Sequence, residues 1–597
     1  MPETIPALFA RQAAAFGSKT LFLATPDGAS RSMTWQEVAQ DVLALAGFLL
    51  SQRVETGDRV LILSENRPEW GLADLAIQSV GAWTVPLYPT LPAGEVSLIA
   101  RDCQPVVAIV STDEQAQKLL ETRAQAPSLR TIIIVEGTPQ QGAGVFRWAE
   151  ALAQGREGGP AAQQAIEARR CRMQPEDTAT VIYTSGTTGE PKGVMLSHRN
   201  FLSNVQACLQ VVSITGDDLH LSFLPLCHVF ERMAGWYLML SVGATISYAR
   251  NMDTIPEDMR RVRPTIMLGV PRFFEKLHAK IQEGVRQAAP WKRRMAQWAF
   301  GVGKRVVAHR QRGRRIPPGL WLQRSLADRL VYSKVKAGLG GRLRFFVSGS
   351  APLSKEIGEF FYGLGVVILE GYGLTETSPV IAVNRPETPR FGSVGPLVPG
   401  VEVRIAEDGE ILTRGPHVMQ GYYRKPEATA AALVDGWFHT GDIGRLDEQG
   451  CLMVTDRKKD LIKTAGGKFI APQKLERLFA ADPYISQVLV YGDRRPYCVA
   501  LIVPNLEQLR RYAQEQEIAA RSLQELVRDR RVVDFYWARV EAAQRDLAGF
   551  ERVKKIALLD QEFSQAGGEL TPTLKAKRGV IAARYEPLLN SLYEAAA

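Results

Sequence analysis

Short apolar runs with the spacing of buried strands alternate with helical patterns along the first part of the chain. Valine, leucine and isoleucine dominate the runs, which we interpret as strands. The runs cover 60–63, 83–87, 106–110, 132–135 and 181–183. A helical pattern at 70–80 lies between two of them. Strands that alternate with helices predict an α/β fold with largely parallel sheets.

One helix start is also visible in the sequence. Thr34 and Glu37 have the spacing of a capping box, in which two side chains satisfy free backbone N–H groups. Four apolar residues then fall on one helical face, namely Val38, Val42, Leu45 and Leu49. We therefore expect a helix that begins after Thr34 and buries this face.

The length of 597 residues exceeds what one hydrophobic core usually organises, so we expect at least two domains. Residues 137–176 are rich in Gly, Gln and Ala and predict a surface connection with a short helix. From 391 to 455, short apolar segments broken by Gly, Asp and Pro predict a compact β region. We place a large domain at 1–457 and a small domain at 458–597.

Composition excludes several classes of protein. Hydrophobic residues make up 46% of the chain and charged residues 23%, as in globular proteins. The six cysteines form no CxxC pair, which favours buried thiols in a reducing compartment. The seven histidines show no metal-ligand spacing with them. Without a signal-peptide pattern or an apolar run of about 18 residues, we expect a cytoplasmic protein, at most peripheral on the inner face of the membrane.

The first chemical signal is the segment YTSGTTGEPKG at 183–193. Its hydroxyl groups, small residues and one positive charge suit a phosphate cradle. The residues concerned are Thr184, Ser185, Gly186, Thr187, Thr188, Gly189 and Lys192. The segment is not a Walker A loop, because glycine follows Lys192 where that motif has Ser or Thr. The alternative is a surface turn with no ligand.

This segment closely resembles the phosphate loop of the adenylate-forming superfamily, which includes acyl-CoA synthetases, luciferases and peptide-synthetase adenylation domains. Six further segments resemble the same family in the same order. They are LPLCHVFER (224–232), VSGSAPLS (347–354), EGYGLTETSP (370–379), GWFHTGDIG (436–444), TDRKKDLIKTAGGKFIAP (455–472) and LTPTLKAKR (570–578). The resemblance implies a large domain of two α/β subdomains plus a small β-barrel, followed by a small, mobile α+β domain.

The chemistry of adenylation assigns roles within EGYGLTETSP. Glu376 is a natural Mg²⁺ ligand, and the resemblance adds Thr184 to the metal site. Thr375 can donate to the α-phosphate, and Tyr372 can lie against adenine. The resemblance places Glu370, Gly371, Gly373 and Ser350 beside the nucleotide. The alternative for Tyr372 is a buried tyrosine in a glycine-flanked turn.

Further roles fall near the end of the large domain. Asp442 can accept hydrogen bonds from both ribose hydroxyls, or it is only a turn former. The resemblance assigns Arg457 to the same ribose and Lys459 to the hinge between the domains; a solvated lysine is the alternative for Lys459. It also implies that Lys575 is the catalytic lysine, with Lys577 as a rival candidate.

The acyl and CoA sites rest on the resemblance. His228 lies at the mouth of the acyl site, with a satisfied core or capping histidine as the alternative. Gly349 and Ala351 flank Ser350 beside the acyl group. The segment around Lys463 lies beside the pantetheine arm of CoA, and Gly466 and Gly467 allow that arm to run close to the backbone. Chain length, HVFER and TPTLKAKR point to the long-chain fatty acyl branch, with ATP, Mg²⁺ and CoA as cofactors and cosubstrates.

Residues 284–327 are strongly basic, and no acidic residue lies between Glu283 and Asp328. Met295, Trp298, Val302 and Val306 fall on one helical stripe. This pattern fits either an interfacial helix on anionic lipid or an ordinary helix docked on the large domain. The net charge of +10 is concentrated here, and we expect no nucleic-acid partner.

Three other functions are compatible with the motifs. A fatty acyl-AMP ligase would form the same adenylate and load a carrier protein, and a luciferase-like enzyme would oxidise it. A non-catalytic homologue would bind a nucleotide or lipid only. The presence of Lys192, Glu376, Asp442, Arg457 and Lys575 argues against the last of these.

Overall fold

The computed structural model describes residues 3–24, 31–137, 144–185, 191–466, 468–520, 522–565, 567–571 and 576–594. Two compact units are present. Unit 2 comprises Ile405–Ile411, Gly441–Leu446 and Met453–Ala597, and the remaining residues form unit 1. The predicted boundary at residue 457 stays a prediction. No helix of the described residues has the length and apolarity needed to cross a membrane.

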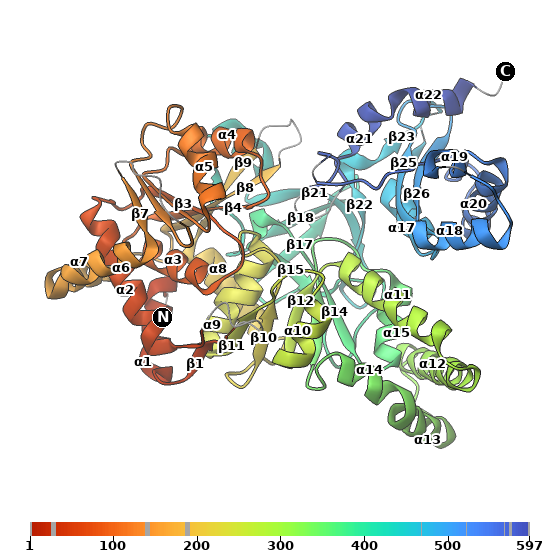
Figure 1. Cartoon of the computed structure of the whole chain (residues 1–597), viewed down its shortest axis with the longest axis horizontal. Helices are drawn as coiled ribbons and strands as arrows, with labels where there is room; N and C mark the ends of the chain where they lie inside the picture. Colours follow the sequence, from red (N-terminus) through yellow and green to blue (C-terminus); the bar gives the residue numbers. More distant parts are fainter. Residues whose placement is uncertain are drawn as a thin grey trace. The chain divides into compact units, whose positions relative to one another are not determined.

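Unit 1 contains two eight-stranded sheets (Figure 1). In the first sheet the parallel strands occupy the middle and one edge, and an antiparallel hairpin extends the other edge. Its strands, in spatial order, are β19 (Gly421–Tyr422), β9 (Pro191–Ser197), β8 (Thr178–Ser185), β4 (Trp83–Leu87), β3 (Arg59–Leu63), β5 (Val107–Val110), β6 (Thr131–Ile134) and β7 (Val145–Arg147). The predicted strands and their parallel arrangement are confirmed.

Helices cover both faces of this sheet because its strands are apolar on both sides. Side chains of β3 alternate between two core clusters: Leu61 and Leu63 lie in one, and Val60 and Ile62 in the other. The first cluster is shared with α4 (Ala93–Cys103) and α5 (Asp113–Thr122). The second is shared with α1 (Ile5–Phe16), α2 (Trp35–Ser51), α3 (Pro68–Ser79), α6 (Trp148–Glu157) and α8 (His198–Leu209).

Helix α2 begins as the sequence predicts. Thr34 and Glu37 form the capping box, and the apolar face of the helix is buried. The prediction for 137–176, a surface connection with a short helix, underestimated the regular structure. This stretch contains β7, α6 and the 14-residue helix α7 (Gly159–Arg172). Tertiary packing explains the difference: Gly155 approaches the backbone of α2 at Ala44 so closely that a Cβ there would overlap it.

The second sheet shares the large central core with the first. Its strands, in spatial order, are β15 (Val380–Val383), β14 (Val367–Gly373), β13 (Phe345–Ser348), β12 (Ile266–Gly269), β10 (Leu219–Ser222), β11 (Thr245–Tyr248), β1 (Thr20–Phe22) and β2 (Met33–Thr34). Its other face packs on α10 (Ile255–Val262), α11 (Pro271–Gln287) and α15 (Lys355–Gly363). Beyond α11 come α12 (Pro290–Gln311), α13 (Pro318–Ala327) and α14 (Ser333–Gly338).

A third sheet follows, as predicted for the β region after residue 391. Its strands are β16 (Gly395–Pro396), β22 (Cys451–Arg457), β21 (Trp437–Leu446), β18 (Glu410–Arg414) and β17 (Glu402–Ile405), with β20 (Leu433–Val434) beside β21. Helix α16 (Pro426–Ala432) lies between β19 and β20 in the chain. The division between the two units passes through strands of this sheet.

Most of unit 2 is a three-stranded sheet with helices on both faces. The strands are β25 (Ile485–Tyr491), β26 (Cys498–Pro504) and β27 (Val553–Leu558), and the hairpin β23 (Ile462–Lys463) and β24 (Phe469–Ile470) precedes them. Every residue of β26 is buried, and its side chains alternate between two cores. The helices are α17 (Pro472–Ala480), α18 (Leu506–Glu515), α19 (Leu523–Leu526), α20 (Arg530–Ala543), α21 (Arg578–Arg584) and α22 (Glu586–Glu594). The predicted α/β class with a large and a smaller domain is confirmed.

Candidate active site

The glycine-rich segment joins the antiparallel strands β8 and β9. Thr184 lies opposite Lys192 in this hairpin, and its hydroxyl is 3.5 Å from the Lys192 carbonyl oxygen. The register therefore places one predicted hydroxyl donor and the predicted phosphate-binding lysine together at the base of the segment. Four predicted residues, Gly186, Thr187, Thr188 and Gly189, lie outside the described residues, as does the side chain of Ser185.

Lys192 is one member of a three-residue arrangement. Its ammonium group lies over the ring of Tyr422 at 5.1 Å from the centroid. The Tyr422 hydroxyl donates to Glu376 Oε1 at 2.9 Å. Burial, together with the charge of Glu376, raises the pKa of Tyr422, so the phenol keeps its proton and acts as the donor. The structure thus brings the predicted metal ligand near the predicted phosphate contact.

Sequence reasoning missed Tyr422. It lies in GYYRKPEAT, a segment without the glycine, threonine and lysine pattern of a phosphate loop. Strand β19 pairs antiparallel with β9, and the Met419 N–H donates to the Glu376 carbonyl oxygen at 2.8 Å. Only this pairing, across more than 200 residues of sequence from β9, brings Tyr422 to the site.

Glu370 and Glu376 belong to one motif but have different surroundings. Glu376 is half-buried in the short helix η3 (Thr375–Thr377), which also contains the predicted residue Thr375. Glu370 is buried and accepts a hydrogen bond from the Leu353 N–H at 2.9 Å. This bond ties β14 to the loop that follows β13, where Ser350 lies.

That loop holds the three predicted residues Gly349, Ser350 and Ala351. Ser350 has a φ of 68°, a left-handed conformation that is uncommon outside glycine. A Cβ on Gly349 would lie 3.0 Å from the ring of Phe230, one of the HVFER residues. The predicted acyl-site segment at 228 and the loop at 349–351 are therefore neighbours.

His228 is half-buried and opens a turn before the π-helix η1 (Glu231–Tyr237). Its Nδ1 accepts a hydrogen bond from the Phe230 N–H at 3.3 Å, and its carbonyl oxygen accepts one from Arg232 N–H. The histidine therefore holds the local turn with its ring, as the capping alternative expects.

The glycines of β14 have different surroundings. A Cβ on Gly373 would overlap the Pro379 carbonyl oxygen, whereas a Cβ on Gly371 would lie 3.5 Å from Val383. Tyr372, between them, is half-buried and pairs with Ala382 of β15. Gly373 is thus required by the close approach of two backbone segments, independently of any nucleotide.

The HVFER segment also supplies a buried ion pair that sequence reasoning did not identify. Arg232 and Asp74 are both fully buried and in contact, although they come from η1 and α3. Arg232 also donates to Thr180 of β8 at 2.7 Å and to the Tyr237 hydroxyl at 2.9 Å. The sequence did contain a signal for this pair: Asp74 is a charged residue within the otherwise apolar run GLADLAI, and a buried charge needs a partner.

Within unit 2, the structure pairs two predicted ribose contacts with each other. Arg457 Nε lies 3.1 Å from Asp442 Oδ1, and the Asp442 side chain is 5% exposed. Lys459 is exposed in the short helix η4 (Lys458–Asp460). Its neighbour Lys458 forms ion pairs with two carboxylates, those of Asp408 and Glu410.

The predicted CoA segment is partly described. Lys463 is exposed, and its ammonium group lies 5.4 Å from the centroid of the Phe469 ring. A Cβ on Gly466 would meet no atom within 4 Å. Gly467 and Lys575 lie outside the described residues. Lys577, the rival of Lys575, is half-buried, and its N–H donates to the Glu569 carbonyl oxygen at 2.8 Å.

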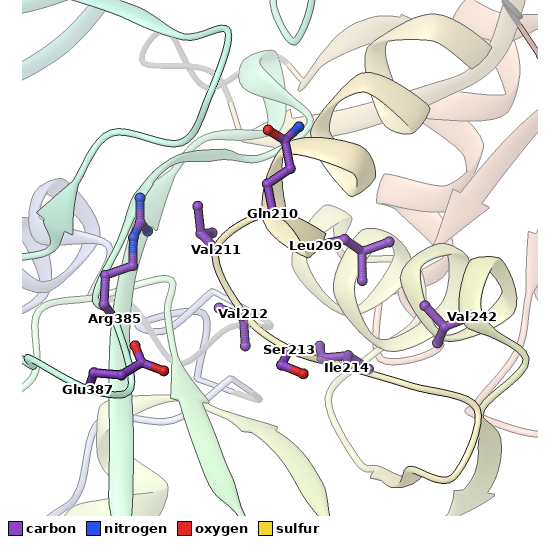
Figure 2. Close-up of a pocket in the computed structure, with 9 residues that line it drawn as sticks. All are labelled: Leu209, Gln210, Val211, Val212, Ser213, Ile214, Val242, Arg385 and Glu387. Carbon is purple, nitrogen blue, oxygen red and sulfur yellow. The ribbon is translucent and has the colours of Figure 1, made fainter.

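Two surface hollows on the described part of unit 1 have different surroundings. One, of about 460 Å³, adjoins Tyr422 and is lined mainly by residues 420–433. The other, of about 610 Å³, lies where the chain leaves α8, away from every predicted site residue. Figure 2 shows its wall from Leu209 to Ile214 facing Arg385 and Glu387. The Arg385 guanidinium donates to the carbonyl oxygens of Val383 and Leu397.

Known proteins resemble the chain over nearly its whole length. Residues 9–423 match the family described as AMP-binding enzyme, and residues 459–597 match the family described as AMP-binding enzyme C-terminal domain. Long-chain-fatty-acid–CoA ligase FadD15 of Mycobacterium bovis is 38% identical over 95% of this chain and 93% of its own. Long chain acyl-CoA synthetase 7, peroxisomal, of Arabidopsis thaliana is 33% identical over 94% of this chain and 81% of its own.

Solved structures support the fold. ATP-bound MatB from Rhodopseudomonas palustris matches with a TM-score of 0.70 at 23% identity, covering 98% of this chain and 99% of that one. The anthranilate CoA ligase AuaEII, solved with anthranoyl-AMP, matches with a TM-score of 0.72 at 20% identity and covers 97% of both chains. By sequence over most of its length, and by fold, this chain belongs to the AMP-binding enzyme family.

Proposed function

We propose that the protein is a long-chain fatty acid–CoA ligase that forms AMP. In the first half-reaction, a carboxylate oxygen of the acid attacks the α-phosphorus of ATP. The bond from this phosphorus to the bridging oxygen breaks, and pyrophosphate leaves. In the second, the sulfur of CoA attacks the carbonyl carbon of the acyl-adenylate, AMP leaves, and the thiol proton is released. CoA brings its own nucleophile, so no cysteine of the protein is needed.

The observation that carries the proposal is the grouping of Lys192, Tyr422 and Glu376 beside the phosphate hairpin. Both substrates of the first step are anions, so catalysis depends on positioning them and on offsetting their charge. Lys192 would contact the phosphates of ATP. Thr375 begins the same short helix as Glu376 and would donate to the α-phosphate.

The oxygen-bearing side chains of Glu376 and Thr184 also fit Mg²⁺. Among the residues that the structure describes, no group of three or more His, Cys, Asp or Glu could hold a metal ion by itself. Mg²⁺ typically takes one or two carboxylates and completes its shell with phosphate oxygens and water. Glu376 and Thr184 would hold it here. When bound, the ion would supply further positive charge to the triphosphate.

The choice of a long-chain acid is supported by the names of the relatives and by the acyl-site segments. Phe230 of HVFER contacts Gly349, so an apolar side chain lies beside the loop that we assign to the acyl group. We propose that His228 lies at the entrance of that site. Asp442 and Arg457 would contact the ribose, and Lys459 would act as the hinge.

The test is incubation of the purified protein with ATP, Mg²⁺ and fatty acids of increasing length, with and without CoA. We expect AMP and acyl-CoA with long chains, detected by mass spectrometry, and loss of both in Lys575→Ala. Lys577→Ala, two residues away, serves as the matched variant and retains activity if Lys575 is the catalytic lysine. Acyl-adenylate that never becomes acyl-CoA would instead indicate a carrier-protein ligase. Absence of AMP with every fatty acid contradicts the proposal.

We further propose that helices α12 and α13 dock on an anionic membrane. Only part of the predicted stripe is used for packing: Val302 and Val306 are buried against α13 and its neighbours, whereas Trp298 is 36% exposed. Other apolar side chains are also exposed: Trp291 (63%), Trp321 (60%), Leu322 (67%) and Leu326 (49%). Exposed basic residues accompany them, including Lys292, Arg293, Arg294, Lys304, Arg305, Arg312, Arg314 and Arg315. Apolar groups beside positive charge fit the interface of anionic lipid.

Sedimentation with vesicles tests this surface. We expect binding to vesicles that contain phosphatidylglycerol and little binding to pure phosphatidylcholine, with the difference lost at high salt. The double variant Trp321→Ser/Leu322→Ser should bind less. The control is Val580→Ser/Leu588→Ser, which removes exposed apolar groups from unit 2. Equal binding by all three proteins contradicts the membrane proposal and leaves the ligase proposal intact.

A further inference from the structure

Tyr422 is held in place by its backbone as well as by its side chain. Its N–H donates to Thr429 Oγ1 at 2.9 Å. The chain before and after Tyr422 bonds to β9: the Tyr423 N–H donates to the Gly193 carbonyl oxygen at 2.7 Å, and the Gln420 N–H, two residues before Tyr422, donates to the Met195 carbonyl oxygen at 3.0 Å. The ring therefore projects from a segment anchored to the strand that carries Lys192.

The side chain of Tyr422 makes two contacts with different chemistry. Its hydroxyl donates to Glu376 Oε1, and its ring face carries the ammonium group of Lys192. A carboxylate has two oxygens, so a hydroxyl on one of them orients the group while the other stays available to a cation. The ring face restrains a lysine whose four-carbon stem is otherwise flexible.

We propose that Tyr422 is a positioning residue that orients Glu376 through its hydroxyl and Lys192 through its ring, so that both meet the metal-bound triphosphate together. The inference rests on the proposed function, because it takes Glu376 as the metal ligand and Lys192 as the phosphate contact. Side chains that orient a metal ligand through a hydrogen bond commonly change metal affinity by about 10- to 100-fold when they are removed.

The two contacts make separable predictions. Tyr422→Phe removes the hydroxyl and keeps the ring, so we expect the Mg²⁺ concentration for half-maximal ATP binding to rise by roughly 10-fold. ATP binding in EDTA should be unchanged in this variant. Tyr422→Leu removes the ring as well and should also weaken ATP binding in EDTA. Isothermal titration calorimetry measures both affinities without turnover.

Tyr423 provides a matched control one residue further along. Its ring packs edge-on against Trp83, with a centroid distance of 6.2 Å. Tyr423→Phe loses the same hydroxyl group, and we expect its Mg²⁺ dependence to match that of the wild type. Circular dichroism melting curves establish that each variant is folded.

Glu376→Gln separates the failure of this inference from that of the proposed function. If Glu376→Gln shifts the Mg²⁺ dependence and Tyr422→Phe does not, Tyr422 has no positioning role and the site assignment stands. If neither variant shifts it, the metal assignment of Glu376 fails, and the inference about Tyr422 fails with it. A shift in Tyr423→Phe equal to that in Tyr422→Phe would also overturn the inference, because the effect would then be unspecific.

Discussion

At the scale of single residues, two glutamates of one motif are candidates for binding the metal ion, and their surroundings distinguish them. Glu370 and Glu376 have the same chemistry and lie six residues apart in one motif. Glu370 is 8% exposed and has a backbone N–H of Leu353 on its carboxylate. Glu376 is less buried and faces Tyr422. We therefore propose that Glu376 is the metal ligand and that Glu370 holds the loop after β13 through Leu353.

Replacement of Glu376 by Gln tests this assignment. The amide keeps the shape and can still accept from Tyr422, but it lacks the negative charge that Mg²⁺ needs. We expect pyrophosphate release to fall roughly 100-fold or more, as is common when one charge-stabilising group is lost. A coupled pyrophosphate assay measures it. Glu387→Gln, at an exposed position beside the hollow of Figure 2, is the control. Equal activity of the two variants would contradict the assignment.

Two glycines of the same motif should differ sharply in their tolerance of a methyl group. Gly373→Ala forces β14 away from Pro379, because the new Cβ would overlap a backbone oxygen that cannot rotate aside. Gly371→Ala places its Cβ in ordinary contact with Val383. We expect Gly373→Ala to lose about 1–3 kcal/mol of stability, the usual range for overpacking, and Gly371→Ala to stay near wild type. Denaturant titration measures the stability of both variants, and an equal loss in the two would contradict this expectation.

At the scale of elements, one buried network joins the two segments that we assign to the nucleotide and acyl sites. Asp74 of α3 accepts hydrogen bonds from Thr84 of β4 at 2.8 Å and from Tyr237 of η1 at 2.7 Å. Arg232 of η1 reaches Thr180 of β8, the strand that leads into the glycine-rich segment. The π-helix, the helix and two strands are thus held by a single ion pair with its hydrogen bonds.

Removal of both partners of this pair should cost less stability than the two single removals added together. Asp74→Ala leaves a guanidinium buried without a counter-charge, and such changes typically cost 3–5 kcal/mol. The double variant Asp74→Ala/Arg232→Met has no buried charge at this place. We expect it to be less destabilised than the sum of the two single variants, by a double-mutant cycle in urea. Strict additivity would show that the two groups do not interact.

At the scale of the whole molecule, buried histidines make unit 1 sensitive to mild acid. Burial, followed by the charge of Arg232, lowers the pKa of His198 from 6.5 to about 3. Burial lowers the pKa of His417 to about 4. Both rings are neutral in the folded state over a range in which the unfolded chain binds a proton. Stability therefore falls as the pH drops below about 6.5.

The pH dependence gives a test with a defined sign. For one histidine, the free energy of unfolding should fall by about 1.4 kcal/mol for each pH unit between roughly 6.5 and 3. His198→Asn keeps an acceptor for the Ile5 N–H and removes the titrating ring. Its unfolding free energy should fall less steeply than that of the wild type as the pH is lowered. Parallel profiles for the two proteins in urea titrations at several pH values would contradict this account.

Local patterns determined the elements of this protein. The capping box at Thr34 and Glu37, the apolar runs that became β3, β4 and β8, and the order of the motifs were all readable from the sequence. They were readable because hydrophobic periodicity and capping depend on residues only a few positions apart. The α/β class followed from the periodicity, and the family followed from the resemblance of the motifs and their order.

The partners of those residues were decided by tertiary structure alone. Pairing of β19 with β9 brought Tyr422 to Glu376, and packing of η1 on α3 joined Arg232 to Asp74. Packing of α12 against α13 and its neighbours placed Val302 and Val306 inside the protein rather than at its surface. Contacts of this kind depend on which strands and helices meet in space, and no local pattern encodes that choice. The sequence therefore indicated the candidate residues of the site, whereas the fold determined how they are held.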